Sequence, residues 1–142
     1  MEDYDRQVAE ICACNAPFYE QFAAWMAASG LSERTVGTHV ENVQFFADEY
    51  LTYQEPLLRV DEADATDVGL FLSDWFLRKA MWSSPGAVRS NIASFKKFFQ
   101  WMGQQGHMDA QVVADILLDL KENRDEYIEA AEAYGADLIG DW

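Results

Sequence analysis

The sequence has few of the residues on which small secreted proteins depend. Only two of its 142 residues are cysteines, Cys12 and Cys14, and they cannot form a disulfide scaffold. Their C-x-C spacing also lacks the second pair that would complete a zinc site. The acidic N-terminus lacks the basic region of a signal peptide, and no apolar run approaches the ~18 residues of a membrane span. These absences predict a soluble, cytoplasmic domain with no membrane partner.

Motifs of catalysis and of metal binding are also missing. No glycine-rich phosphate loop, Ser-His-Asp set or pair of catalytic carboxylates stands out, so an enzyme is not expected. The acidic run that starts at Asp61 fails the calcium-loop pattern, because Thr66 and Leu72 occupy the positions that need glycine and glutamate. These acids are better explained as residues at the start of a helix. No metal and no cofactor is predicted.

Basic residues are scarce, and their distribution is uneven. The chain has 10 Lys and Arg against 25 Asp and Glu, a net charge of −15 that opposes non-specific binding to nucleic acid or anionic membranes. Residues 78 to 107 nevertheless hold five basic side chains and no acid, which leaves −20 on the rest. Arg89, Lys96 and Lys97 are separated by seven and eight residues, or about two helical turns, so we expect them on one side of a helix.

The apolar residues recur at helical spacing along the whole chain, and no segment alternates like a strand. Serine or aspartate stands where most helices should begin, and Pro85 suits a first helical turn. The stripes are narrow and the connections short, which favours an all-α fold, a compact bundle of four to five helices. We expect an N-terminal helical extension over residues 1–16, a helical domain over 17–134 and a loose acidic tail over 135–142. Helices are expected to begin near Glu2, Pro17, Ser32, Asp64, Ser84 and Asp109.

A pattern made of the run Gly30 to Thr35, the run Asp64 to Val68 and the helix that begins at Ser84 resembles the N-terminal core-binding (SAM-like) domain of tyrosine recombinases, the phage-integrase type. The resemblance covers about residues 18 to 110. Its strongest part is the serine-opened helix from Ser84 to Trp101, with its Phe99-Gln100-Trp101 end. Further similar positions are Phe22, Trp25, His39, Val43, Phe46, Phe71 and Leu72.

The resemblance implies a domain that clamps one side of a DNA duplex and has no catalytic role alone. By position, the contacts on the fourth long helix are Arg89, Ser90, Asn91, Lys96 and Lys97. The implied contacts on the second long helix lie near Arg34, Thr35, Thr38, His39 and Asn42. Here the chain departs from the family, because Gly37, Val40 and Glu41 stand where basic residues are usual.

The catalytic domain of the recombinases has no counterpart after Met108. Tyr127 and Tyr134 are present there, but no histidine could activate either as a nucleophile. The acidic ending favours a stand-alone relative, which predicts weak binding to double-stranded DNA unless a catalytic recombinase partner assists.

Two alternatives stay open. The chain could be an acidic protein-interaction module of the same fold that has lost DNA binding and contacts a basic protein. In the second alternative, the acidic last helix lies across the basic residues Arg89, Lys96 and Lys97 of the fourth long helix and inhibits DNA binding. The oligomeric state is not predicted.

Overall fold

The computed structural model describes residues 2–140, with side chains for residues 2–136, and within them it contains helices and no strand. The predicted all-α class is therefore confirmed. In chain order the elements are α1 (Glu2–Ala28), α2 (Glu33–Gln44), η1 (Phe45–Tyr50), η2 (Leu51–Tyr53), η3 (Val60–Glu62), α3 (Ala65–Leu70), η4 (Phe71–Trp75), α4 (Phe76–Lys79), α5 (Pro85–Gln104), α6 (Ala110–Glu122) and α7 (Arg124–Gly140).

The helical elements outnumber the four to five helices expected, because two continuous helices are each divided into shorter segments and the chain after Asp109 forms two helices. α2, η1 and η2 form one continuous rod over 33–53, and α3, η4 and α4 form another over 65–79. Each rod contains a π-helical stretch, η1 or η4. The described chain therefore has six helical rods besides the 3-10 turn η3.

The structure differs from three of the expected boundaries. The expected break before Pro17 does not occur: α1 runs through it, and the buried Asn15 just before it is fixed by hydrogen bonds to two other segments. The expected single helix after Asp109 is divided at Asn123, whose backbone departs from helical geometry. The segment expected as a loose tail continues α7 as far as Gly140, and residues 141–142 lie outside the described chain.

The predicted helix starts follow from side chains that accept hydrogen bonds from free N–H groups in the first turn. Ser32 accepts from Thr35, and Ser84 accepts from Ala87. Asp109 accepts from both Gln111 and Val112. Asp64 and Asp67 form a reciprocal capping pair at the start of α3, which confirms the helix-start interpretation of that acidic run.

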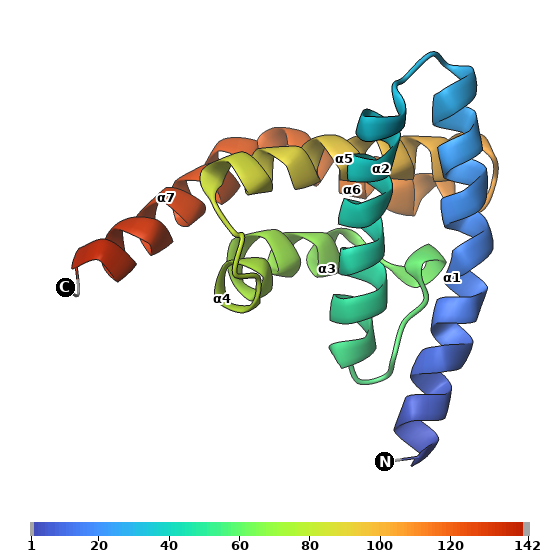
Figure 1. Ribbon diagram of the computed structural model, residues 1–142, viewed down its shortest axis with the longest axis horizontal. Helices are drawn as coiled ribbons and strands as arrows, with labels where there is room; N and C mark the ends of the chain where they lie inside the picture. The colour runs from blue at the N-terminus through green and yellow to red at the C-terminus, as the bar shows by residue number, and fades with distance from the viewer. Residues whose placement is uncertain (1, 141–142) are drawn as a thin grey trace.

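α5 lies at the centre of the arrangement (Figure 1). α2 crosses it steeply, α1 lies beside α2, and α6 packs along α5. α7 begins against α5 and then extends away from the other helices toward the C-terminus. α5 has contacts with α2, α6 and α7, so it supplies much of the core.

The core is rich in phenylalanine. Phe46 from η1, Phe71 from η4 and Phe95 from α5 meet with ring centroids 5.0 to 5.7 Å apart, at tilted or edge-on angles that aromatic pairs prefer. α7 also contributes to the core, because Tyr127, Ile128 and Ala131 are buried. The residues that α5 buries are Val88, Asn91, Ile92, Ser94, Phe95, Phe98, Phe99, Trp101 and Met102.

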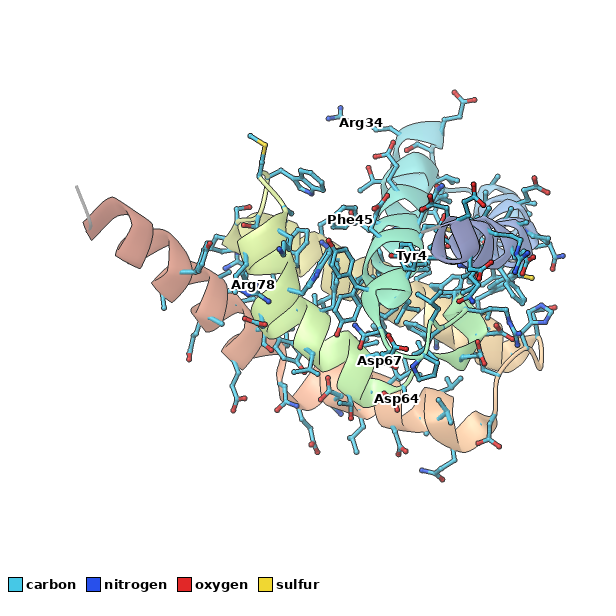
Figure 2. The ribbon with its side chains drawn as sticks, turned by 90° about the horizontal axis from the view of Figure 1, so that it is seen from below. Tyr4, Arg34, Phe45, Asp64, Asp67 and Arg78 are labelled. Carbon is cyan, nitrogen blue, oxygen red and sulfur yellow. The ribbon has the colours of Figure 1, made fainter. Side chains whose placement is uncertain are left out.

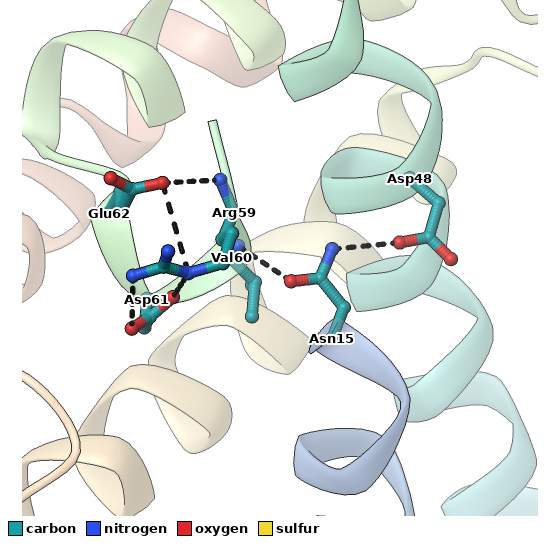
Figure 3. Close-up of polar contacts among 6 residues, drawn as sticks. All are labelled: Asn15, Asp48, Arg59, Val60, Asp61 and Glu62. Atoms are coloured by element: carbon teal, nitrogen blue, oxygen red, sulfur yellow. Dashed lines mark hydrogen bonds and ion pairs between the residues drawn. The ribbon is translucent and has the colours of Figure 1, made fainter. Parts of the chain in front are cut away.

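A buried polar network fixes α1 to the rest of the bundle (Figure 3). Asn15 is fully buried; its amide nitrogen donates to Asp48 at 2.9 Å, and its oxygen accepts from the N–H of Val60 at 2.9 Å. The hydroxyl of Tyr19 donates to the same oxygen of Asp48 at 2.8 Å. Three segments distant in the sequence are thus joined by one amide and one carboxylate.

We expect Asn15→Ala to destabilise the protein, because the change leaves the buried N–H of Val60 without its partner and removes one of the two hydrogen bonds to Asp48. The free energy of unfolding should fall by about 1–3 kcal/mol. Gln21→Ala, an exposed position on the same helix, is the control and should shift it by less than about 0.5 kcal/mol. Urea denaturation followed by circular dichroism measures both, and equal stability of the two variants would contradict the role given to Asn15.

Candidate nucleic-acid interface

The exposed sector of α5 is narrow and basic. Ser84 and Pro85 start the helix, and its neighbours then cover most of its circumference. The side chains left exposed between the ends include Arg89, Ala93, Lys96 and Gln100, which recur every three or four residues. α5 itself contains no acidic residue. Its outer surface is therefore a ridge of cations alternating with small or neutral side chains.

A cleft of about 610 Å³ lies beside this ridge and is lined by α5, α6 and the start of α7. Four cations from three helices surround it, and its apolar lining comes from Ile92, Leu117 and Leu120. No Asp or Glu of the described chain lines it. We call it the basic cleft; its lining residues are Arg89, Ile92, Ala93, Lys96, Gln100, Leu117, Leu120, Lys121 and Arg124.

Lys121 and Arg124 line the cleft, although the sequence pattern did not indicate them as site residues. They lie in the most acidic part of the chain, where basic side chains are most simply explained as ion-pair partners. A usable signal existed, because they are the only two basic residues after Met108 and are three positions apart. The end of α6 and the start of α7, on either side of the break at Asn123, direct both of them to the cleft.

Lys97 does not share this cleft, so the expectation of one common side for the three α5 cations was too simple. Side chains seven residues apart on a helix point in nearly the same direction from its axis. Side chains eight residues apart differ in direction by most of a right angle. Lys97 is half-buried and lies on the side of α1, with its Nζ 5.8 Å from the ring centroid of Trp25. This is within the range of a cation–π contact.

Arg89, Lys96 and Lys97 have no carboxylate within 4 Å in the described chain. Arg6, Arg59, Arg78 and Arg124, by contrast, have carboxylate partners within that distance. The partner of Arg124 is its exposed neighbour Asp125 at 3.5 Å, a contact that contributes little in water. Like charges around one cleft repel each other, so an anion placed there would be stabilised.

Four polar side chains form a network where α2 crosses α5. Ser94 donates its hydroxyl to the backbone oxygen of Ser90 at 3.0 Å and accepts from Asn42 at 2.9 Å. Nδ1 of His39 lies 2.7 Å from the same hydroxyl, at hydrogen-bond distance. Asn42 also donates to Ser90 at 3.0 Å.

Several residues implied as DNA contacts are therefore engaged within the protein. His39 and Ser90 hold α2 against α5, and Asn91 is buried, with its amide donating to the backbone oxygen of Ala87. Thr38 donates its hydroxyl to the backbone oxygen of Arg34, and the hydroxyl of Thr35 accepts from Ser32 at the helix start. Arg34 is exposed near the beginning of α2 (Figure 2).

The last helix lies beside α5, as the self-inhibition hypothesis requires, but it does not neutralise the α5 cations in the described chain. No described carboxylate of α7 comes within 4 Å of Arg89, Lys96 or Lys97. Removing the segment after Lys121 would also take away Tyr127 and Ile128, which are buried in the core. Such a truncation would therefore test the stability of the fold rather than inhibition.

Comparison with protein-family models, curated proteins and solved structures found no match to this chain. No helix among the described residues is long and apolar enough to cross a membrane. Within the same residues, no group of three or more His, Cys, Asp and Glu side chains is arranged to hold a metal ion.

The environment of His39 should make the stability of the protein depend on pH. The pKa of His39 is lowered in the folded protein, mainly by burial and to a smaller extent by the charge of Lys97. At a pH between the two pKa values, His39 binds more protons in the unfolded chain than in the folded protein. The stability that comes from keeping His39 neutral is therefore fully present above about pH 6.5, and it is lost as the pH falls through the lowered pKa. Between pH 7.5 and 5.5 the wild type should lose more free energy of unfolding than His39→Gln. Denaturation at the two pH values measures this, and parallel losses would contradict it.

Proposed function

We propose that this protein binds duplex DNA non-catalytically, with the ridge of α5 and the basic cleft contacting the phosphate backbone. The observation that carries the proposal is the convergence of Arg89, Lys96, Lys121 and Arg124 on one cleft with no acidic lining residue, in a chain of net charge −15. Scattered cations on so acidic a surface would be expected to lie beside carboxylates. The absence of acids from the lining of the cleft is what a polyphosphate ligand needs.

The spacing of the α5 cations suits a nucleic-acid backbone. Arg89 and Lys96 are seven residues apart, or about 10 Å along the helix axis at about 1.5 Å per residue. This corresponds to about three base-pair steps of a DNA strand, at about 3.4 Å each. Ala93 lies between them and is exposed, so no bulky side chain keeps the helix from the duplex.

The net charge weakens this binding without preventing it. Carboxylates more than about 8 Å from a phosphate are largely screened at physiological ionic strength. Those nearer to the duplex repel it, so the affinity of the isolated chain should be low and strongly dependent on salt. A second DNA-binding domain or a protein partner would raise it.

The resemblance to the core-binding domain of tyrosine recombinases supports the same helix as the DNA contact, and this family assignment stays a prediction. Within it, Arg89 and Lys96 are the residues that we propose to contact phosphate, together with the cleft residues Lys121 and Arg124. The half-buried Lys97 and the exposed Arg34 lie outside the basic cleft and are not counted among these four contacts. A non-catalytic role fits the C-terminal tyrosines, since Tyr127 is buried and donates to Asp119.

Neutralising two cleft residues should weaken DNA binding and flatten its dependence on salt. Four phosphate contacts predict a slope of log K against log salt of about −3.6, and Lys96→Gln/Lys121→Gln should reduce it to about −1.8. Fluorescence anisotropy with a labelled 20-base-pair duplex, titrated between 20 and 150 mM salt, measures both slopes.

The control for this experiment is Arg6→Gln/Arg59→Gln, which changes the net charge equally. Its two positions lie on α1 and just before η3, outside the basic cleft. This control should keep the wild-type slope. The proposal fails if the duplex does not bind at 20 mM salt, or if both double variants lose affinity equally.

A further inference from the structure

A second surface of the molecule has the opposite chemistry. A groove of about 540 Å³ lies between the first half of α1 and the rod formed by α2, η1 and η2. Four acidic residues line it and no Lys or Arg does: Asp5, Glu41, Asp48 and Glu49. The Tyr4 hydroxyl, which donates to the backbone oxygen of Thr52 at 2.9 Å, joins the two walls. We call this the acidic groove.

The field inside the acidic groove is negative. Asp48 accepts its hydrogen bonds from neutral groups, Asn15 and Tyr19, so its charge is not cancelled there. Asp5, Glu41 and Glu49 have no basic partner within 4 Å in the described chain. Cys12 lines the same groove. The pKa of its thiol is raised, mainly by burial and to a smaller extent by the charge of Asp48.

A row of aromatic side chains continues from the groove across the surface. Phe45 and Tyr53 line the groove itself. Phe45 contacts Trp82 at 5.0 Å and Trp75 at 5.7 Å between ring centroids, and Trp75 contacts Tyr53 at 5.9 Å. Tyr53 is 67% exposed and Trp82 is 58% exposed. In Figure 2, Phe45 lies at the side of the α2 rod, and Tyr4 is seen over the rod.

Tyr53 and Trp82 are exposed, and the half-buried Phe45 and Trp75 connect them. A contiguous aromatic surface of this kind marks a binding surface, since single exposed apolar residues are ordinary and contiguous ones are rare. The adjoining carboxylates select the ligand. They oppose anionic membranes and nucleic acid, and they favour Lys and Arg. Tyrosine and tryptophan at the centre of a contact, with charges at the rim, are also typical of protein interfaces.

We propose that the acidic groove and the aromatic row together bind a basic amphipathic helix of a partner protein. Its apolar side chains contact Phe45, Trp75 and Trp82, and its Lys or Arg side chains pair with Glu41 and Glu49. A groove between two helical walls fits a third helix. The α1 wall from Tyr4 to Cys12 is about 12 Å long, which suits two to three turns.

A second copy of this chain fits the surface less well. The cations of its α5 ridge would suit the carboxylates, but the ridge offers Ala93 and Gln100 rather than large apolar side chains to the aromatic row. The proposal is also independent of DNA binding, because the groove and the basic cleft share no residue.

The test uses an 18-residue helical peptide made of leucine and lysine, with leucines on one face, titrated into the full chain by calorimetry. Glu41→Lys/Glu49→Lys should weaken its binding about tenfold or more, because two attractive contacts become repulsive. Tyr53→Ser/Trp82→Ser should weaken it to a similar extent through the loss of apolar contact. A peptide with glutamate in place of lysine should not bind.

The matched control is Glu129→Lys/Glu132→Lys on α7, two exposed positions outside the groove that change the net charge by the same amount. It should change the affinity by less than about threefold. Circular dichroism verifies that each variant folds. Equal losses in the two charge-reversal variants would overturn the proposal, because they would show only general attraction of a cation to an acidic protein.

Two further measurements distinguish a partner protein from a second copy of this chain, and peptide binding from DNA binding. Sedimentation of the free chain as a monomer supports a partner protein, and self-association that Glu41→Lys/Glu49→Lys abolishes would overturn it in favour of a second copy. Lys96→Gln/Lys121→Gln should bind the leucine–lysine peptide as the wild type does. Peptide binding and DNA binding can therefore fail separately.

Discussion

Packing against α5 is the constraint on which the rest of the structure depends. α2, α6 and α7 all lie against this helix, and together with α1, η1 and η4 they bury nine of its side chains. What remains exposed is a narrow sector, and its composition decides what the protein presents to solvent there. Since α5 has no acidic residue, the sector carries only cations and neutral side chains. A central structural helix is in this way also a chemically distinct surface.

Charge is separated in space as well as along the chain. The basic cleft gathers cations from α5, α6 and α7, whereas the acidic groove lies between α1 and the α2 rod. Gathering like charges on one surface has an electrostatic cost in the free protein, which pairing with opposite charges would remove. Two surfaces of opposite sign on one small bundle are consistent with simultaneous binding of a polyanion and a basic protein segment.

Much of the fold could be predicted from the sequence, because helix starts and apolar stripes are local features. Ser32, Ser84 and Asp109 cap helices as expected, since each needs only the N–H groups of its own first turn. The continuous α1 was not predictable in this way. The local signal at Pro17 favours a helix start, and the contacts that keep the helix continuous come from Asp48 and Val60, more than thirty residues away.

The candidate site was only partly predictable, for the same reason. Arg89 and Lys96 follow from the spacing along one helix, but Lys121 and Arg124 join them through the packing of α6 and α7 against α5. His39 and Ser90 look like surface polar residues in the sequence. Only the crossing of α2 over α5 turns them toward each other and makes them part of an internal network. A linear pattern does not contain that crossing.

The placement of the indole rings gives each surface its own optical signal. Trp82 and Trp75 lie in the aromatic row next to the acidic groove, while Trp25 lies beneath Lys97 at the edge of the α5 ridge. Tryptophan emission responds to the polarity and charge around each ring. A ligand in the acidic groove would therefore change the emission of Trp75 or Trp82, and a ligand on the α5 ridge would change that of Trp25. Replacing these tryptophans one at a time by phenylalanine would separate the two responses without any external label.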